Sequence, residues 1–128
     1  MGLNILLVDD SRVVRAVLAR ALELSGVAVT ALHEAGDGEE ALAVLEKEAV
    51  DLVFTDLMMP RMDGERLLAE MQRRGLAARI PVVVISSAGG APRERLLREA
   101  GARAFLRKPF TPEEVLAVVQ RLVGEVTL

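Results

Sequence analysis

The sequence predicts an α/β fold in which a parallel sheet of five strands lies between helices. Three short apolar runs, at residues 5–8, 52–54 and 82–85, are continuous rather than alternating and are rich in β-branched residues. Such runs are typical of parallel strands that are covered on both faces. Segments with helical spacing lie between the runs, and this alternation indicates a parallel sheet with right-handed crossovers.

Two weaker runs complete the five predicted strands. Residues 27–35 form the second strand, and residues 104–106 form the fifth, which the Lys108-Pro109 pair ends. The functional site of such a sheet is expected at the carboxyl ends of its strands, where the strand order reverses.

Helical spacing of apolar residues predicts a first helix over residues 12–24, with Ser11 as its N-cap and Gly26 as its end. The last helix opens with the run 111–114, in which a threonine cap, a proline in first position and a glutamate three residues after the cap agree with one another. Further apolar stripes predict helices around residues 41–45, 67–71, 96–100 and 115–122.

The length of 128 residues is typical of one compact domain, so we predict a single domain over residues 1–128. No apolar stretch approaches the ~18 residues that a membrane helix needs. The N-terminus has no basic region followed by a small-residue cleavage site, as a secretion signal would. We therefore expect a cytoplasmic protein without membrane insertion. The absence of cysteine excludes a disulfide framework and thiol catalysis.

The net charge of −3 argues against direct binding of nucleic acid. One segment, residues 91–108, is nevertheless locally basic, and we call it the basic segment. Its basic residues, opposed by Glu94 and Glu99, are Arg93, Arg95, Arg98, Arg103, Arg107 and Lys108.

Acidic residues follow two of the predicted strands. Asp9 and Asp10 come after the first strand and Asp56 after the third, so the sheet is expected to bring them to one edge. Two like charges about 4 Å apart repel by ~1 kcal/mol in water and ~4 kcal/mol at an effective dielectric of 20. A divalent cation would relieve this repulsion, and oxygen ligands alone suit Mg²⁺. The alternative is that Asp9 and Asp10 only cap the first helix and Asp56 begins a turn.

Two further polar groups are expected at the same edge. Lys108 follows the fifth strand, and its alternative role is a simple salt bridge. Ser86 ends the fourth strand, where its hydroxyl can donate to an anionic oxygen or cap a helix. Acids, a lysine and a hydroxyl together make a site able to hold a metal ion and a phosphoryl group.

Together these residues resemble the receiver domain of response regulators, especially its stand-alone chemotaxis type, over nearly the whole chain. The resemblance implies a flavodoxin-like, doubly wound sheet in the order 2-1-3-4-5, flanked by five helices. The matching motifs follow the family's order: residues 5–10 with their acidic pair, 54–60, 62–64, Ser86, 101–102 and 108–110.

The resemblance implies two-component signal transduction. Asp56 would accept a phosphoryl group from a phosphohistidine on a sensor histidine kinase or phosphotransfer protein. Asp10 would bind Mg²⁺ directly and Asp9 through water, while Asp56 and the backbone carbonyl of Met58 would complete the protein's ligands.

The resemblance also assigns the switch. Lys108 and Ser86 would bind the phosphoryl oxygens, and Phe105, which stands where many relatives have tyrosine, would turn inward as Ser86 moves. The alternative is that Phe105 is simply a core residue of its strand. Met58 and Ala88 are apolar where relatives often carry polar groups that help or hinder the hydrolytic water.

Partners are implied by the same resemblance. We expect the face of the fourth helix, fifth strand and fifth helix to control a separate target protein, with chemotaxis as one such pathway. The basic segment lies on this face and is expected to meet an acidic segment of the target. Paired receivers usually carry acids just before the fifth strand, and residues 101–104 have none, so we expect a monomer. The chain would not be an enzyme, because it would catalyse only its own phosphorylation and dephosphorylation.

Two other classes of protein fit the layout less well. A phosphatase with an aspartate nucleophile would need two acids two residues apart in one loop, whereas Asp9 and Asp10 are adjacent and Asp56 is distant. A flavin-binding module would need a glycine-rich first loop with a hydroxyl, and aromatic rings to cover the flavin. The sequence Asp-Asp-Ser-Arg at residues 9–12 and the absence of Trp and Tyr argue against it.

Overall fold

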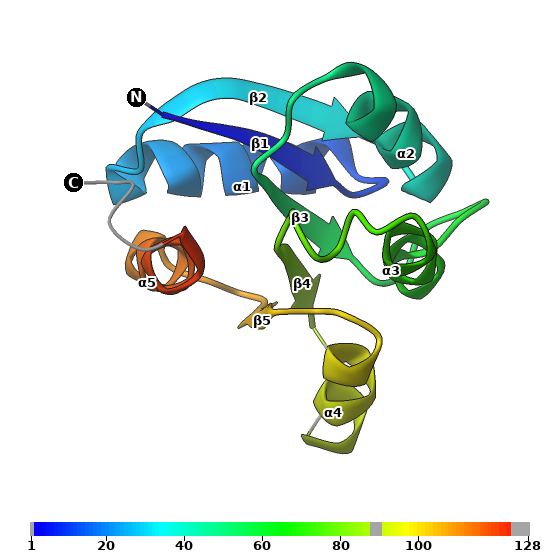
Figure 1. Cartoon of the computed structure of the whole chain (residues 1–128). Helices are drawn as coiled ribbons and strands as arrows, with labels where there is room; N and C mark the ends of the chain where they lie inside the picture. Colours follow the sequence, from blue (N-terminus) through cyan, green and yellow to red (C-terminus); the bar gives the residue numbers. More distant parts are fainter. Residues whose placement is uncertain (1, 88–90, 124–128) are drawn as a thin grey trace.

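The computed structural model describes residues 2–87 and 91–123, so Ala88 lies outside the described residues. Strands and helices alternate strictly along the described chain, as the sequence predicts (Figure 1). The elements are β1 (Leu3–Val8), α1 (Arg12–Ser25), β2 (Val29–Ala35), α2 (Gly38–Lys47), β3 (Leu52–Asp56), α3 (Gly64–Arg73), β4 (Val82–Ser86), α4 (Ala91–Glu99), β5 (Ala104–Arg107) and α5 (Pro112–Val123). None of these helices is both long enough and apolar enough to cross a membrane.

The sheet confirms the predicted fold class. Its five strands are parallel and lie in the order β2-β1-β3-β4-β5. Because β1 pairs with both β2 and β3, the strand order reverses beside β1. Val8 is level with Ala35 on one side and with Thr55 on the other, so β1 and β3 end at the same height. This switch point is where ligand sites form in open α/β sheets.

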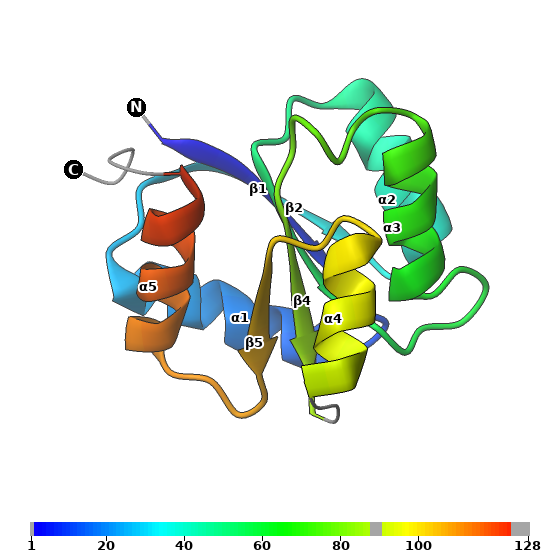
Figure 2. The ribbon, with the colours of Figure 1, turned by 60° about the horizontal axis from the view of Figure 1, so that its bottom comes forward.

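Helices cover the two faces of the sheet, with α1 and α5 on one face and α2, α3 and α4 on the other (Figure 2). Successive strand residues point into opposite cores: Leu6 and Val8 belong to the core under α2 and α3, whereas Ile5 and Leu7 belong to the core under α1 and α5. Because both faces are covered, the central strands are mostly apolar, and their polar residues are Asn4, Thr55 and the strand-end residues Asp56 and Ser86. The edge strand β2 is half exposed, which explains its weaker signal. It begins two residues later than predicted because its pairing with β1 starts at Val29.

The predicted helix ends are confirmed by hydrogen bonds. The Ser11 hydroxyl accepts the N–H of Val14 at 3.2 Å, and α1 ends at Gly26 in a left-handed conformation (φ 85°). At the start of α5, the Thr111 hydroxyl accepts the N–H of Glu114 at 3.1 Å, and the Glu114 carboxylate accepts the N–H of Thr111 at 2.8 Å. These reciprocal bonds form a capping box.

Candidate functional site

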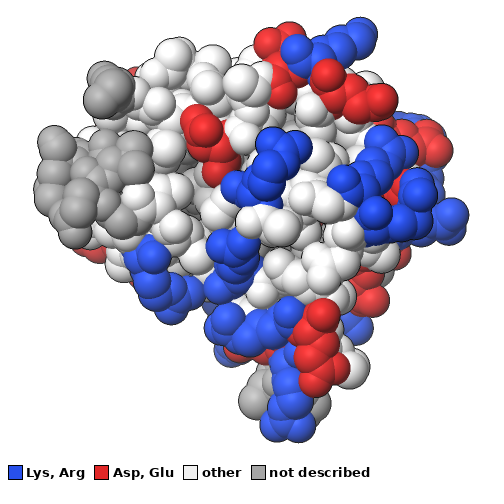
Figure 3. Space-filling model, viewed as in Figure 1, with Lys and Arg blue, Asp and Glu red and all other residues white. Residues whose placement is uncertain are grey.

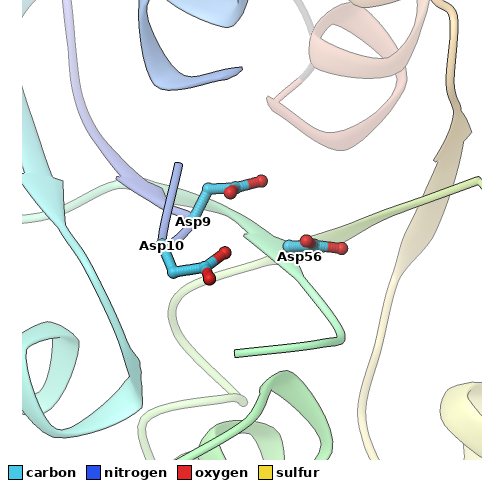
Figure 4. Close-up of side chains that lie close together, drawn as sticks. All are labelled: Asp9, Asp10 and Asp56. Atoms are coloured by element: carbon cyan, nitrogen blue, oxygen red, sulfur yellow. The ribbon is translucent and has the colours of Figure 1, made fainter. Parts of the chain in front are cut away.

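Three acids meet at the switch point. Asp9 and Asp10 directly follow β1, and Asp56 ends β3. Each offers a carboxylate oxygen, and these oxygens lie within 4.8 Å of one another. Figure 4 shows the three side chains side by side at the ends of the two strands. The structure therefore brings together the acids that the sequence predicts at this edge, and we call them the acid cluster.

The environments of the three acids differ. Asp9 is buried, Asp56 is half-buried and Asp10 is exposed. The Asp9 carboxylate accepts the N–H of Ser11 at 2.8 Å, and the Asp56 carboxylate accepts the N–H of Leu57 at 2.8 Å. The N-cap of α1 is Ser11, so the alternative in which Asp9 and Asp10 cap this helix is wrong.

Lys108 brings a cation to the acid cluster. Its Nζ lies 3.6 Å from an oxygen of Asp9 and 3.6 Å from an oxygen of Asp56, so one ammonium is shared by two carboxylates. The N–H of Lys108 donates to the carbonyl of Ser86 at 3.0 Å, which ties the ends of β4 and β5 together. The structure thus places Lys108 and Ser86 at the predicted edge.

The pKa of Asp9 lies above the usual value for an aspartate. Burial is the largest cause and raises this pKa, and the charges of Asp56 and Asp10 raise it further. The N–H of Ser11 and the ammonium of Lys108 lower it, but the net shift is upward. An oxygen-only donor set with excess negative charge fits Mg²⁺, which binds through a few carboxylates and retains water.

We expect Asp9→Asn to stabilise the metal-free protein by about 1 kcal/mol at pH 7, because it removes one of the crowded charges. Since the pKa of Asp9 is raised on folding, the folded state binds more protons than the unfolded chain. The contribution of Asp9 to the free energy of unfolding is therefore greatest below its pKa of ~3.9 in the unfolded chain. This contribution is lost as the pH rises through the pKa of Asp9 in the folded protein. Urea unfolding between pH 4 and pH 8 measures this dependence, which the variant should flatten.

The control for Asp9→Asn is Asp51→Asn. Asp51 is exposed and accepts the N–H of Asn4 at 2.8 Å, a bond that asparagine can also accept. The control should leave the pH dependence unchanged. If Asp9→Asn lowers the free energy of unfolding at pH 7, the charge of Asp9 is not a source of strain.

Phe105 lies half-buried on β5, at the edge of the core under α2 and α3. The guanidinium carbon of Arg98 is 4.8 Å from the centre of its ring, a cation–π contact. A cavity of about 30 Å³ between β4, β5 and α4 is lined by Phe105, Ser86 and Leu97, among others. Phe105 is thus neither fully in the core nor fully exposed, and it shares a small cavity with Ser86.

Ion pairs within the protein already involve part of the charge of the basic segment. Arg93 forms an ion pair with Glu65, and a nitrogen of Arg107 lies 3.9 Å from Glu94. Lys108 belongs to the site itself. In Figure 3, basic and acidic side chains lie next to one another over α4. The charge available to an acidic partner is therefore smaller than a count along the chain predicts.

Sequence reasoning missed two residues near the site, Asp37 and Arg61. Their side chains form an ion pair with a nitrogen–oxygen distance of 2.5 Å. Asp37 has a local signal, because an aspartate before a helical apolar stripe is a typical N-cap. Arg61 has no local signal, since its pairing arises only where two loops pack together.

The doubly wound sheet in the order 2-1-3-4-5 defines the flavodoxin-like class of α/β proteins, and in this chain an acidic site lies at the switch point. Residues 5–120 match the model of the response regulator receiver domain, and the chain belongs to this family. Receiver domains are the signalling switches of two-component systems, and they interact with histidine kinases and downstream effectors. They generally bind Mg²⁺ in an acidic pocket.

Relatives by sequence are response regulators. MprA of Mycobacterium tuberculosis is 36% identical over 123 residues, which cover 96% of this chain and 51% of MprA. A gliding motility regulatory protein of Myxococcus xanthus is 39% identical over 115 residues, which cover 90% of this chain and 14% of that protein. The chain spans about half the length of MprA and a smaller share of the second relative.

Solved structures with the same fold are receiver domains too. The chemotaxis protein CheY4 of Vibrio cholerae has a TM-score of 0.83 at 28% identity, with 94% of this chain and 98% of that chain covered. The receiver domain of NtrX from Brucella abortus has a TM-score of 0.82 at 31% identity, with 95% and 99% covered. The resemblance inferred from the motifs is confirmed.

Proposed function

We propose that this chain is a phosphorylation switch in which Asp56 accepts a phosphoryl group in a Mg²⁺-dependent reaction. One observation carries the proposal. The carboxylate of Asp56 stands within 4.8 Å of those of Asp9 and Asp10 and 3.6 Å from the ammonium of Lys108. Clustered acids with one cation suit a site that takes up a divalent metal ion together with a phosphoryl group.

The proposed donor is a phosphohistidine on a sensor histidine kinase or phosphotransfer protein. A carboxylate oxygen of Asp56 attacks the phosphorus, and a new P–O bond forms as the P–N bond breaks. The electron pair of the broken bond returns to the imidazole nitrogen, which takes up a proton. The chain thereby catalyses only its own modification, and water later removes the phosphoryl group.

The proposed Mg²⁺ ligands are Asp9, Asp10, Asp56 and the backbone carbonyl of Met58. When bound, the ion neutralises negative charge on the phosphoryl oxygens. Lys108 would bind one of these oxygens, since its ammonium already lies between two carboxylates. The exposed position of Asp10 suits a direct ligand, whereas Asp9 is buried and already accepts the N–H of Ser11.

We further propose that the phosphoryl group acts through Ser86 and Phe105. It adds up to about −2 charge and three acceptor oxygens next to Ser86. The cavity that Ser86 shares with Phe105 supports a coupled movement of the two side chains. This movement would change the face formed by α4, β5 and α5 and so control a separate target protein, with chemotaxis as one such pathway.

The remaining proposals concern the state of the protein. We propose that residues 1–128 act as one receiver domain and that the domain is a cytoplasmic monomer. The absence of acids in residues 101–104 supports the monomer, because paired receivers use acids there to bridge to a second copy.

Incubation with acetyl phosphate and Mg²⁺, followed by measurement of intact mass, tests the proposed function. We expect the wild type to gain the mass of one phosphoryl group, and we expect EDTA to abolish this gain. Acetyl phosphate replaces the kinase, so the assay needs no partner protein. Absence of the gain in a protein whose circular dichroism shows it to be folded would contradict the proposal.

A further inference from the structure

Arg61 has an unusual backbone. It lies in the loop between β3 and α3, residues 57–63, which we call the β3–α3 loop. Its φ of 60° makes it the only residue other than glycine with a positive φ in the described part of the chain. Residues with a side chain rarely adopt this left-handed conformation, because it brings the Cβ close to the backbone. It persists only where contacts with the surrounding structure stabilise it. The contacts that hold Arg61 therefore determine the course of the loop.

The first contact is with Asp37, which is fully buried. One oxygen of its carboxylate accepts the N–H of Glu40 at 2.9 Å and so caps α2. The other oxygen accepts from Arg61, whose Nε and Nη2 each lie 2.5 Å away. The guanidinium covers the buried carboxylate from the solvent side, since the Arg61 side chain is largely exposed.

A second contact holds the neighbouring residues together. The N–H of Gly38 donates to the carbonyl of Met62 at 2.8 Å. A Cβ at position 38 would lie 2.5 Å from Cγ of Met62, so the loop packs directly on the first turn of α2. Residues 37–38 and 61–62 are thus joined by a backbone hydrogen bond and an ion pair.

The charges of the pair support a tight contact at neutral pH. Burial would raise the pKa of Asp37, but the N–H of Glu40 and the guanidinium of Arg61 outweigh burial and lower this pKa. The carboxylate of Asp37 is therefore negatively charged at neutral pH.

This contact lies close to the acid cluster. The β3–α3 loop starts directly after Asp56 and contains Met58, whose carbonyl we assigned to Mg²⁺. Arg61 and Asp10 line the same surface groove. A loop held at residues 61–62 keeps the segment from Asp56 to Met58 in a defined place relative to Asp10.

We propose that the ion pair of Asp37 and Arg61 positions the β3–α3 loop for Mg²⁺ binding and phosphoryl transfer, so that Arg61 is a positioning residue of the site. The inference rests on the proposed function. Removing a group that orients the metal ligands without binding the metal itself typically lowers the affinity for the metal about 10-fold to 100-fold.

Three variants test the proposal. Arg61→Met keeps the length of the side chain and removes its charge, whereas Arg61→Lys keeps the charge. Asp37→Asn keeps a good N-cap and removes the ion pair. The matched control is Arg79→Met, because Arg79 is exposed and precedes β4 at the amino ends of the strands, away from the site.

Calorimetric titration with Mg²⁺ and the rate of phosphorylation by acetyl phosphate are the readouts. We expect Arg61→Met to raise the Kd for Mg²⁺ about 10-fold and to slow phosphorylation at low Mg²⁺, with Arg61→Lys in between. Asp37→Asn should raise the Kd for Mg²⁺ by a similar factor. The double variant with Asp37→Asn and Arg61→Met should bind Mg²⁺ as well as either single variant, because both substitutions remove the same ion pair. The control should bind as the wild type does.

Urea unfolding separates positioning from mere stabilisation. Variants that are less stable but bind Mg²⁺ and accept phosphate as the wild type does would overturn the proposal and leave the proposed function intact. A wild type that neither binds Mg²⁺ nor gains phosphoryl mass would overturn both.

Discussion

Replacing Asp56 by asparagine will give a folded protein that takes up no phosphoryl group. An amide oxygen cannot replace the carboxylate as nucleophile, so we expect the rate of phosphorylation to fall by at least about 1,000-fold. Intact mass after incubation with acetyl phosphate and Mg²⁺ measures the loss. The fold should persist, because the substitution removes a charge that raises the pKa of Asp9.

The control for this substitution is Asp63→Asn, which makes the same change of charge at the other end of the β3–α3 loop. The Asp63 side chain caps α3 by accepting the N–H of Arg66 at 2.9 Å, and asparagine caps a helix equally well. Asp63→Asn should therefore be phosphorylated at the rate of the wild type. Phosphorylation of Asp56→Asn at the wild-type rate would show that another residue is the acceptor.

The second large effect is expected from Gly64→Ala. Gly64 is the first residue of α3, and its N–H donates to the carbonyl of Leu57 at 2.9 Å. A Cβ there would lie 2.2 Å from the backbone oxygen of Asp56 and 3.0 Å from Cα of Leu57. Backbone atoms cannot move aside as a flexible side chain can. We expect a loss of about 3 kcal/mol or more in the free energy of unfolding, a large part of the ~5–15 kcal/mol of a typical domain.

Far-UV circular dichroism in urea measures this loss, since the chain has no Trp or Tyr to report unfolding by fluorescence. Gly36→Ala is the matched control, because a Cβ at position 36 would meet only the flexible end of Glu40, at 3.4 Å. It should change stability far less. A stable Gly64→Ala protein with unchanged phosphorylation would show that the close approach of α3 to the end of β3 is not required.

The sequence alone predicted those features that depend on near neighbours or on the topology of a parallel sheet. The covered strands follow from continuous apolar runs, because each strand residue faces one of two cores. The cap at Ser11 follows from a serine directly before an apolar stripe, and the cap at Thr111 follows from a threonine with a glutamate three residues later, since a cap bonds within its own first turn. The acid cluster followed from topology, because parallel strands end at one edge of a sheet.

The tertiary structure decided what depends on distances between loops. Helix propensity favours alanine over glycine by ~1 kcal/mol, which predicts the opposite sign for Gly64→Ala. Only the approach of Gly64 to the carbonyl of Asp56 reverses that sign. The pairing of Arg61 with Asp37 and of Arg93 with Glu65 is likewise absent from any local pattern. Local hydrogen bonds and strand burial are encoded within a few residues, whereas contacts between loops arise only when the packed elements bring distant residues together.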